Sequence, residues 1–406
     1  MPLDVDAIRA QFPALLRTVG DRPAAYLDGP GGTQVPDRAI AAIGGFLRAG
    51  GSNLGAPFVT SRETATVTES ARVSIGALFN ASPDEIVFGQ NMTTLTFAMS
   101  RALAATWEQG DNIVLTRLDH DANVWPWVRA AQETGVELRW LDFDPDAGCR
   151  LHGETLSGLL DERTRLVAVT HASNAVGTIV DIGSVVEDAH RANALTYVDA
   201  VHYSPHRLVD VAAIGTDFLV ASAYKFFGPH TGCLYGRRQV LDELDAYKIR
   251  PAPDKAPDKW ETGTQSFESL AGVTAAVDYI ASLGEQTESS LRSRLVSAMA
   301  AIGDYEETLS ARFLDGIDGM GRVTLYGENN AEGRTPTFAL SVEGVPPAEV
   351  SRRLGEQGIF VWSGDYYAVE VMRRLGKADQ GLVRIGFVHY NTAGEVDRVL
   401  EALAGL

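Results

Sequence analysis

The hydrophobic positions along the first two thirds of the chain fall into two alternating patterns. Short continuous apolar runs alternate with longer segments in which apolar residues recur at helical spacing. The short runs predict strands at Glu85–Phe88, Asn112–Leu115, Glu137–Leu141, Leu166–Thr170, Leu195–Asp199, Phe218–Ala221 and Cys233–Gly236. The longer segments predict helices at Asp37–Arg48, Glu63–Phe79, Thr93–Ala105, Val124–Thr134, Ile182–Ala192 and Ser269–Ser282. Continuous apolar strands separated by helices are typical of a mainly parallel sheet with helices on both faces, here of seven strands.

A different pattern follows a long helical stretch, which we expect at about Thr287–Leu314. It predicts strands at Val323–Tyr326, Thr337–Ser341, Ile359–Trp362 and Leu382–Phe387, and helices at Pro347–Gln357, Tyr366–Leu375 and Ala393–Leu403. A chain of 406 residues exceeds the size at which one core stops growing. We therefore expect an α/β protein with a large domain over residues 31–285 and a small C-terminal α+β domain over residues 286–406. Residues 1–30 are expected to pack with the small domain.

Composition narrows the classes of partner. With 45% apolar and 22% charged residues the chain has an ordinary globular composition, and its net charge of −18 argues against binding nucleic acid or anionic membranes. The beginning of the sequence lacks the pattern of a signal peptide, and no apolar run approaches the roughly 18 residues that span a bilayer. Two cysteines provide neither a disulfide framework nor a multi-cysteine metal site, so no metal is expected and a cytoplasmic location is the simplest expectation.

Lys225 lies in the most informative segment, directly after the apolar run that ends at Ala221. Burial at a strand end favours the neutral amine, which is the form that attacks a carbonyl. Ser222, three residues earlier, offers a hydroxyl that can hold a phosphate, and Gly228-Pro229 turns the chain away.

Asp199 ends another predicted strand. A lysine and an aspartate at neighbouring strand ends are the pair that a pyridoxal phosphate (PLP) site requires: the lysine forms a Schiff base, and the carboxylate keeps the pyridine nitrogen protonated. Ligands of such sheets bind beyond the C-terminal strand ends, where both residues fall. On these two residues alone, a surface lysine and a helix-capping aspartate are an equally open interpretation.

Two further strand ends carry polar groups. The segment from Phe88 to Thr94 runs from a strand through a turn into a helix, whose N-terminus would attract a phosphate, although most such turns are only capped helix starts. Asn174 follows the strand that ends at Thr170. It can hydrogen-bond the phenolic oxygen of PLP, or simply form a turn.

At this point the chain resembles the class V aminotransferase superfamily, which consists of fold type I PLP enzymes, and within it the cysteine desulfurase-like branch. The resemblance covers essentially the whole chain, from the motif Tyr26-Leu27-Asp28-Gly29-Pro30-Gly31-Gly32-Thr33 to Val383-Arg384-Ile385-Gly386, with the motifs in the family's order and spacing.

The resemblance implies roles for individual residues. Lys225 matches the Schiff-base lysine, Asp199 the partner of the pyridine nitrogen, and Asn174 the residue at the phenolic oxygen. Phosphate contacts are implied for Met92, Thr93, Ser222 and Tyr224, the last in place of a histidine. Thr264 matches a threonine that reaches the phosphate of the other subunit's cofactor, which implies a homodimer with shared active sites. Arg384 matches the arginine that binds the substrate carboxylate, together with Gly29 and Asn174.

The departures from the family bear on the reaction. Desulfurases use a mobile cysteine that takes up sulfur as a persulfide, but Tyr367 stands at that position. Cys149 follows a turn and Cys233 begins a predicted core strand, so neither replaces it.

Two other family positions differ as well. The ring-stacking histidine aligns with Asp121, with His120 one place earlier, and His202 stands where the family usually has a glutamine. His202 is either an acid or base in catalysis, or a neutral hydrogen-bonding residue.

We therefore expect a PLP enzyme that acts on a small α-amino acid through an external aldimine, with Lys225 removing the Cα proton. Loss of a β-substituent would make it a C–S or C–Se lyase without persulfide relay. Class V aminotransferase and epimerase activities are the alternatives, and Tyr367 or His202 can be the acid that decides between them. A catalytically silent PLP-binding module is the hypothesis of another class. Five aromatic residues are expected to wall the pocket: Trp125, Trp127, Trp362, Tyr366 and Tyr367.

Overall fold

The computed structural model describes residues 3–406, without the side chains of residues 153 and 154, and its largest sheet has seven strands. Their order is β4-β12-β11-β10-β9-β5-β6. The bounds are Ile86–Gly89 for β4, Asn112–Thr116 for β5, Glu137–Leu141 for β6, Thr164–Thr170 for β9, Leu195–Asp199 for β10, Phe218–Ser222 for β11 and Gly232–Gly236 for β12. All seven strands predicted from the apolar runs are present, each within two residues of its expected bounds, which confirms the mainly parallel sheet.

One strand runs against the others. β12 pairs antiparallel with both β11 and β4, whereas the remaining neighbours pair in parallel. The six other strands therefore share one direction, and their C-terminal ends lie along one edge of the sheet. This edge carries the candidate residues that follow β4, β9, β10 and β11.

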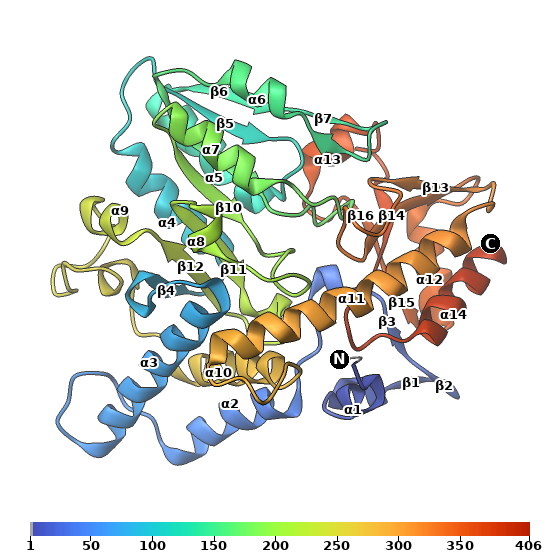
Figure 1. Ribbon diagram of the computed structural model, residues 1–406, viewed down its shortest axis with the longest axis horizontal. Helices are drawn as coiled ribbons and strands as arrows, with labels where there is room; N and C mark the ends of the chain where they lie inside the picture. Colours follow the sequence, from blue (N-terminus) through green and yellow to red (C-terminus); the bar gives the residue numbers. More distant parts are fainter. Residues whose placement is uncertain (1–2) are drawn as a thin grey trace.

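Helices cover both faces of this sheet (Figure 1). On one face α4 (Met92–Ala104) and α5 (Trp125–Thr134) bury apolar residues against Tyr197 and its neighbours. On the other face α3 (Val59–Phe79), α7 (Ile182–Arg191) and α10 (Phe267–Ala281) pack against Val198 and its neighbours. Adjacent residues of one strand thus enter two different cores, because side chains alternate across a strand. This two-sided burial explains why the strands are continuously apolar.

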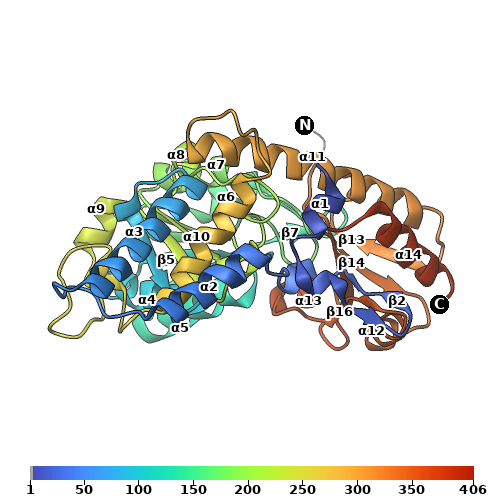
Figure 2. The same cartoon turned by 90° about the horizontal axis from the view of Figure 1, so that it is seen from below.

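Shorter elements complete this part of the chain. They are α1 (Val5–Arg9), β1 (Thr18–Val19), β2 (Arg22–Pro23), α2 (Asp37–Ala49), β7 (Phe143–Asp144), β8 (Arg150–Leu151), α6 (Gly153–Leu159), α8 (Val211–Ile214) and α9 (Arg238–Glu243). Helix α2 lies along α10, on the side of the molecule seen in Figure 2.

A second sheet of four antiparallel strands forms the C-terminal part. Its order is β13-β14-β17-β16, with bounds Val323–Tyr326, Thr337–Val342, Leu382–Gly386 and Trp362–Gly364. Its helices are α11 (Leu291–Ile317), α12 (Pro347–Glu356), α13 (Val369–Arg374) and α14 (Ala393–Ala404). The long helix α11 extends from the large sheet's helices to the small sheet (Figure 1). This arrangement confirms the predicted small α+β unit.

Two predictions in this region were wrong in detail. The strand expected at Ile359–Trp362 is two strands, because β15 (Ile359–Phe360) pairs in parallel with β3 (Ala25–Tyr26), whereas β16 pairs with β17. The helix expected from Tyr366 begins only at Val369, since Tyr366 and Tyr367 both have left-handed backbone angles, with φ of 56° and 57°. The domain limits at residues 30 and 285 stay a prediction.

Among the described residues, no helix combines the length and the apolar character that crossing a bilayer demands.

Candidate active site

A cavity of about 430 Å³ lies where the C-terminal edge of the large sheet meets the small sheet. The segments after β4, β5, β9 and β11 contribute Thr93, Phe97, His120, Asp121, Ala122, Trp125, Pro126, Asn174, Tyr224 and Lys225. Pro30 and Gly31 come from the N-terminal segment, and Trp362, Tyr366, Tyr367 and Arg384 from the small sheet and its loop. Residues from the N-terminal segment, from the edge of the large sheet and from the small sheet thus meet in one cavity.

Lys225 ends a single helical turn that follows β11. Its Nζ donates a hydrogen bond to the carbonyl oxygen of Pro30. Burial and, to a smaller extent, the nearby Arg384 lower the pKa of this ammonium to about 7, against the opposing effects of Asp199 and Asp28. A large part of the amine is therefore neutral near pH 7, as a nucleophile requires.

Asp199 is the last residue of β10, the strand beside β11. Its carboxylate accepts a hydrogen bond of 2.8 Å from the Val201 amide. Burial raises the pKa of this carboxyl to about 6, and the charge of Lys225 opposes part of that rise. Asp199 is not among the described residues that line the cavity, but its carboxyl interacts electrostatically with Lys225, which does line it.

Asn174 connects three parts of the site. Its Nδ2 donates to the Tyr366 carbonyl at 3.0 Å, and its own carbonyl accepts from Nη1 of Arg384 at 3.0 Å. Its Oδ1 is buried and has no hydrogen-bond partner among the described residues. A buried polar atom without a partner is costly, so this oxygen is available for a ligand.

Arg384 lies on β17 and is buried. Its guanidinium carbon lies 4.5 Å from the centroid of the Tyr366 ring. Burial lowers the pKa of the guanidinium to about 10, and the nearby Tyr366 and Asp28 oppose this. Arg384 thus stays cationic at neutral pH, as binding of a carboxylate requires.

The predicted phosphate contacts lie at the start of α4. Asn91 caps the helix, and its Oδ1 accepts from the Thr94 amide at 2.9 Å. The amide of Met92 donates to Oγ of Ser222 at 3.0 Å, and Thr93 lines the cavity. Tyr224 also lines the cavity, with its ring centroid 5.0 Å from Nζ of Lys225. The structure thus places the N-terminus of α4 beside the hydroxyl of Ser222 and the ring of Tyr224 near Lys225, and the phosphate contacts stay a prediction.

His120 and Asp121 both line the cavity but have different surroundings. Burial, with the positive charges of Lys225 and Arg384, lowers the pKa of His120 to about 3. Burial raises the pKa of Asp121, whose next strongest interaction is with Glu370 of α13. The imidazole therefore interacts electrostatically with the cationic residues of the site, whereas the carboxylate interacts with α13.

His202 lies outside the cavity lining and is buried. Its Nε2 lies 3.0 Å from the hydroxyls of both Thr335 and Thr337. Burial holds its pKa well below the usual value, and the neighbouring His206 adds to this. This environment favours a neutral, hydrogen-bonding imidazole.

Tyr367 lies at the cavity mouth with 71% of its surface exposed. Its ring centroid is 5.6 Å from that of His120, and its carbonyl accepts a hydrogen bond of 2.6 Å from the Asp121 amide. This bond and the one from Asn174 to Tyr366 fix the backbone of the loop that ends at Ala368.

Three sequence-predicted residues lie elsewhere. Gly29 is buried and absent from the cavity lining, and a Cβ at this position would lie 2.9 Å from Val388. Thr264 lines a separate hollow of about 550 Å³ beside the start of α4. Trp127 was wrongly placed in the pocket wall: it is fully buried in the core under α5, and its Nε1 donates to Asn123.

Phe97, Pro30 and Asp28 also belong to the site or lie beside it, but they were not predicted from the sequence as functional residues. Phe97 follows Thr93 by one helical turn on α4, so its spacing alone indicated the same face. Pro30 approaches Gly386 so closely that a Cβ there would lie 2.3 Å from the proline ring. Burial raises the pKa of Asp28 to about 6, and its Oδ1 has no partner in the described part of the chain.

Comparison with known proteins agrees with this geometry. The family model described as aminotransferase class-V matches residues 25–399. The chain belongs to the class V aminotransferase family. It is 32% identical to an "Aminotransferase-like protein FGM3" from Gibberella zeae, over 98% of this chain and 97% of that protein. It is also 32% identical to a cysteine desulfurase from Salmonella gallinarum, over 99% of this chain and 98% of that protein.

A solved structure is similar over the whole chain. The apo structure of a cysteine desulfurase from Thermococcus onnurineus NA1 superposes with a TM-score of 0.88 at 25% identity, covering 100% of this chain and 99% of that one. The fold is therefore that of the fold type I PLP enzymes, as the sequence predicted, and this class V aminotransferase is a PLP-dependent enzyme of the cysteine desulfurase-like kind.

The residues in the cavity and those beside it at the same edge of the sheet fit this cofactor. A lysine with a pKa near 7, a buried carboxylate on the adjoining strand and a helix N-terminus beside a hydroxyl lie at one sheet edge. The Oδ1 of Asn174 has no hydrogen-bond partner in the described part of the chain, so this side chain still has hydrogen-bonding capacity for a polar group of the cofactor.

Proposed function

We propose that this class V aminotransferase is a C–S (or C–Se) lyase, which removes a β-substituent from a small α-amino acid without a persulfide relay. PLP supplies the carbonyl that condenses with the substrate amine and the electron sink that makes the Cα proton acidic. The observation that carries the proposal is the absence of a thiol at the cavity: no cysteine is among the described residues that line it.

The two cysteines support this reading. Cys149 and Cys233 are both fully buried in the large core. Burial raises the pKa of the Cys149 thiol to about 12 and also raises that of Cys233, so neither is a thiolate at neutral pH. A sulfur atom that leaves the substrate therefore has no protein thiol to accept it, and departs as a free thiol or sulfide.

The roles of the protein's groups follow from their positions. Arg384 holds the substrate carboxylate, because it is buried, cationic and fixed by Asn174. Lys225, freed as a neutral amine, takes the proton from Cα. The Cβ–S bond then breaks, the sulfur leaves with the bonding pair and takes up a proton, and water hydrolyses the remnant to pyruvate and ammonium. Asp199 stabilises a protonated ring nitrogen.

We propose that His120, rather than Asp121, stacks on the face of the cofactor ring. Its imidazole lies in the cavity beside Tyr367, and Lys225 and Arg384 both influence its charge, whereas Asp121 interacts with Glu370. The neutral form, which its lowered pKa favours, lets the ring stack without adding a positive charge to the site.

We further propose a homodimer in which Thr264 reaches the partner's site. Thr264 lines a hollow shared with Gln90 and Thr94, next to the helix start that would hold the phosphate of its own subunit. Exposed apolar residues on neighbouring segments, among them Leu47, Phe58 and Val59, offer a surface for a second copy. Sedimentation at several concentrations tests this part on its own.

A product assay tests the reaction. PLP-loaded protein is incubated with L-cysteine, L-cystine, L-selenocysteine and L-alanine, and sulfide or selenide, pyruvate and alanine are measured separately. Pyruvate and sulfide in equal amounts from cysteine, without alanine, are expected, and Lys225→Ala should abolish both. Iodoacetamide treatment should leave the rate unchanged, because both thiols are buried.

Alanine together with sulfide would overturn the proposal, since it would mean desulfuration. Pyruvate from alanine itself would mean transamination, and racemised alanine would mean an epimerase. No turnover together with no spectral change when the amino acids are added would leave a PLP-binding module without activity, whereas a spectral change without turnover would favour the transaminase or epimerase.

A further inference from the structure

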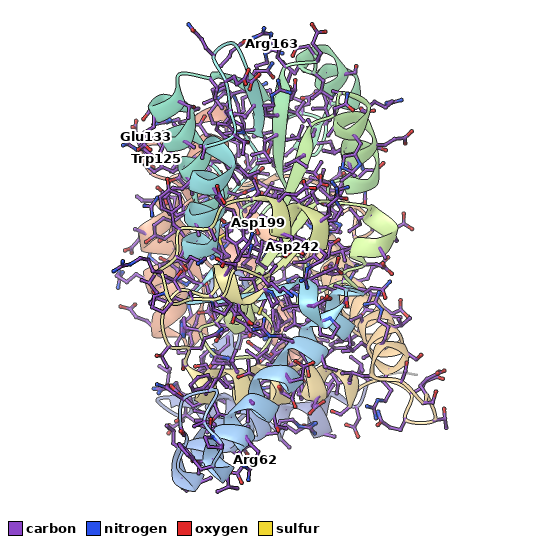
Figure 3. All side chains as sticks on the ribbon, turned by 90° about the vertical axis from the view of Figure 1, so that its left-hand side faces the viewer. Arg62, Trp125, Glu133, Arg163, Asp199 and Asp242 are labelled. Atoms are coloured by element: carbon purple, nitrogen blue, oxygen red, sulfur yellow. The ribbon has the colours of Figure 1, made fainter. Side chains whose placement is uncertain are left out.

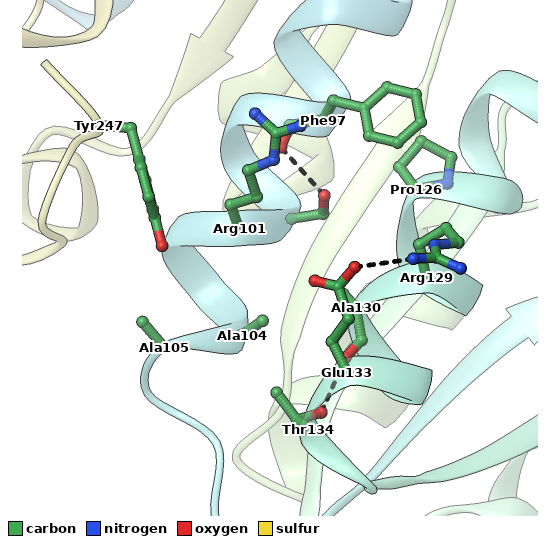
Figure 4. Close-up of a pocket in the computed structure, with 11 residues that line it drawn as sticks. Phe97, Arg101, Ala104, Ala105, Pro126, Arg129, Ala130, Glu133, Thr134 and Tyr247 are labelled. Carbon is green, nitrogen blue, oxygen red and sulfur yellow. Dashed lines mark hydrogen bonds and ion pairs between the residues drawn. The ribbon is translucent and has the colours of Figure 1, made fainter.

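A second cavity of about 370 Å³ adjoins the active-site cavity (Figure 4). Phe97 and Pro126 line both of them. The second cavity, called the outer cavity below, is otherwise formed by α4, α5 and Tyr247. Figure 4 shows the Phe97 ring directed toward Pro126 at one end of it. These two residues therefore lie at the junction of the two cavities.

Helical spacing places the two cavities one after the other between α4 and α5, and together they are called the groove below. Along α4, Thr93, Phe97 and Arg101 follow one another at four-residue intervals and so share a face. Thr93 lines only the active-site cavity, Phe97 lines both, and Arg101 lines only the outer cavity. Along α5, Trp125 lines only the active-site cavity and Pro126 lines both cavities. Arg129 and the lining residues that follow it on α5 line only the outer cavity. The groove thus runs between α4 and α5, away from Lys225.

The two ends of this groove differ in chemistry. The inner end has Lys225, which is largely neutral near pH 7, and the cationic Arg384, which is the proposed site of the substrate carboxylate. The junction of the two cavities is apolar and aromatic, with Phe97 and Pro126. Trp125, which precedes Pro126 in the active-site cavity, is 48% exposed. Figure 3 shows Trp125 at the margin of the molecule, on the same side as Glu133.

The charges of the outer cavity are partly compensated within it. Arg129 and Glu133 form an ion pair of 3.0 Å along α5. An apolar substrate group in the groove therefore meets aromatic surface first, and then a wall on which Arg129 and Glu133 neutralise each other and Arg101 is charged.

We propose that the groove between α4 and α5 is a subsite for a bulky apolar or aromatic group on the substrate's β-sulfur, so that the substrate class is S-substituted cysteines. This rests on the proposed C–S lyase activity. The Cα–H and Cβ–S bonds break, the sulfur leaves with the bonding pair and is protonated, and water converts the remainder to pyruvate and ammonium. The released thiol carries the bulky substituent along the groove.

Binding and turnover are tested with matched compounds. S-benzyl-L-cysteine and S-methyl-L-cysteine are compared with analogues in which carbon replaces sulfur, namely L-2-amino-5-phenylpentanoate and L-norvaline, which have no leaving group. Calorimetry on the PLP-loaded protein gives each dissociation constant. The phenyl compound should bind about tenfold or more tightly than norvaline, because its ring leaves water for an aromatic surface.

Variants locate the effect in the groove. Phe97→Ala and Trp125→Ala should each lower the affinity ratio between the phenyl compound and norvaline by about threefold or more. Leu16→Ala, which removes an exposed residue remote from both cavities, should leave the ratio unchanged. If a variant unfolds, Phe97→Leu serves in its place, since it keeps apolar volume but loses the ring.

The two proposals fail in different ways. Equal affinities for the phenyl compound and norvaline, or variants that leave the ratio unchanged, would overturn the subsite, even if S-methyl-L-cysteine yields pyruvate. Selective binding of the phenyl compound without release of a thiol from either S-benzyl-L-cysteine or S-methyl-L-cysteine would overturn the lyase activity, and with it this substrate class.

Discussion

The guanidinium of Arg384 lies over the ring of Tyr366, with 4.5 Å between the guanidinium carbon and the ring centroid. The same tyrosine accepts a hydrogen bond from the Asn174 side chain through its carbonyl, and donates one from Oη to the Leu382 carbonyl. Arg384 in turn donates to the Asn174 carbonyl. Tyr366, Asn174 and Arg384 therefore form one closed unit. It joins the loop after β16 to the proposed cofactor contact and to the proposed carboxylate site.

This unit predicts that Tyr366 positions Arg384. Tyr366→Leu removes the ring under the guanidinium and should raise KM about tenfold, because a partly buried cation–π contact contributes about 1–2 kcal/mol. Tyr366→Phe keeps the ring and should raise KM less. Steady-state kinetics of both variants gives KM and kcat separately. A purely structural role would instead lower thermal stability in both variants without this difference in KM.

Lys225 should make the stability of the cofactor-free protein depend on pH. Its pKa is about 7 in the folded protein and about 10.5 in the unfolded chain, so between these values the unfolded state binds more protons. Stability therefore rises with pH across this window, and the cost of burying the ammonium is fully present at or below pH 7. Lys225→Met removes that cost and should stabilise the cofactor-free protein at pH 7 by a few kcal/mol, on the order of 1.4 kcal/mol for each unit of pKa shift.

The measurement is urea unfolding of both proteins from pH 7 to pH 10. The stability difference between the variant and the wild type should shrink as pH rises. Lys255→Met, at an exposed position, is the control and should show no such trend. A constant difference for Lys225→Met would mean that the amine is not held neutral by burial.

His202 should act through hydrogen bonds rather than by titrating. Burial keeps its pKa well below the usual value, and Nε2 already faces the hydroxyls of Thr335 and Thr337. His202→Gln should therefore leave the shape of the pH–rate profile unchanged between about pH 6 and 8. If an ionisation in that range disappears from the kcat profile of the variant, His202 is an acid or base after all.

The sequence predicted those parts of the molecule that local pattern decides. The seven strands of the large sheet were found from their apolar runs because both faces of that sheet are buried. The position of Lys225 and Asp199 at one edge of the sheet was predictable because parallel strands bring their C-terminal ends together there, whereas their roles stay a prediction. Strand pairing in the small sheet was less accessible: nothing in residues 359–362 indicates that β15 leaves its neighbours to pair with β3.

Contacts between distant segments account for the other differences. His202 has hydroxyl partners that lie more than a hundred residues away in sequence, so its neutral state was one of two open interpretations. Trp127 looked like a pocket residue because it is aromatic and close to Trp125, but the two lie on different faces of α5. Only the packing of α5 against the sheet decides which of them reaches the cavity.

Tyr367 stands where the resemblance to the desulfurases implies a cysteine, and its hydroxyl should influence turnover. The ring lies at the cavity mouth beside His120, while its backbone is held by Asp121. Tyr367→Phe removes only the hydroxyl and leaves the fixed loop intact, so PLP content and substrate affinity should be retained. If the phenol protonates the departing sulfur, kcat should fall about tenfold or more, since general acids contribute factors of roughly a hundred or above. Rapid-quench measurement of thiol release, with PLP content determined on the same sample, separates this step from cofactor binding. Unchanged kinetics would reduce Tyr367 to a wall of the cavity.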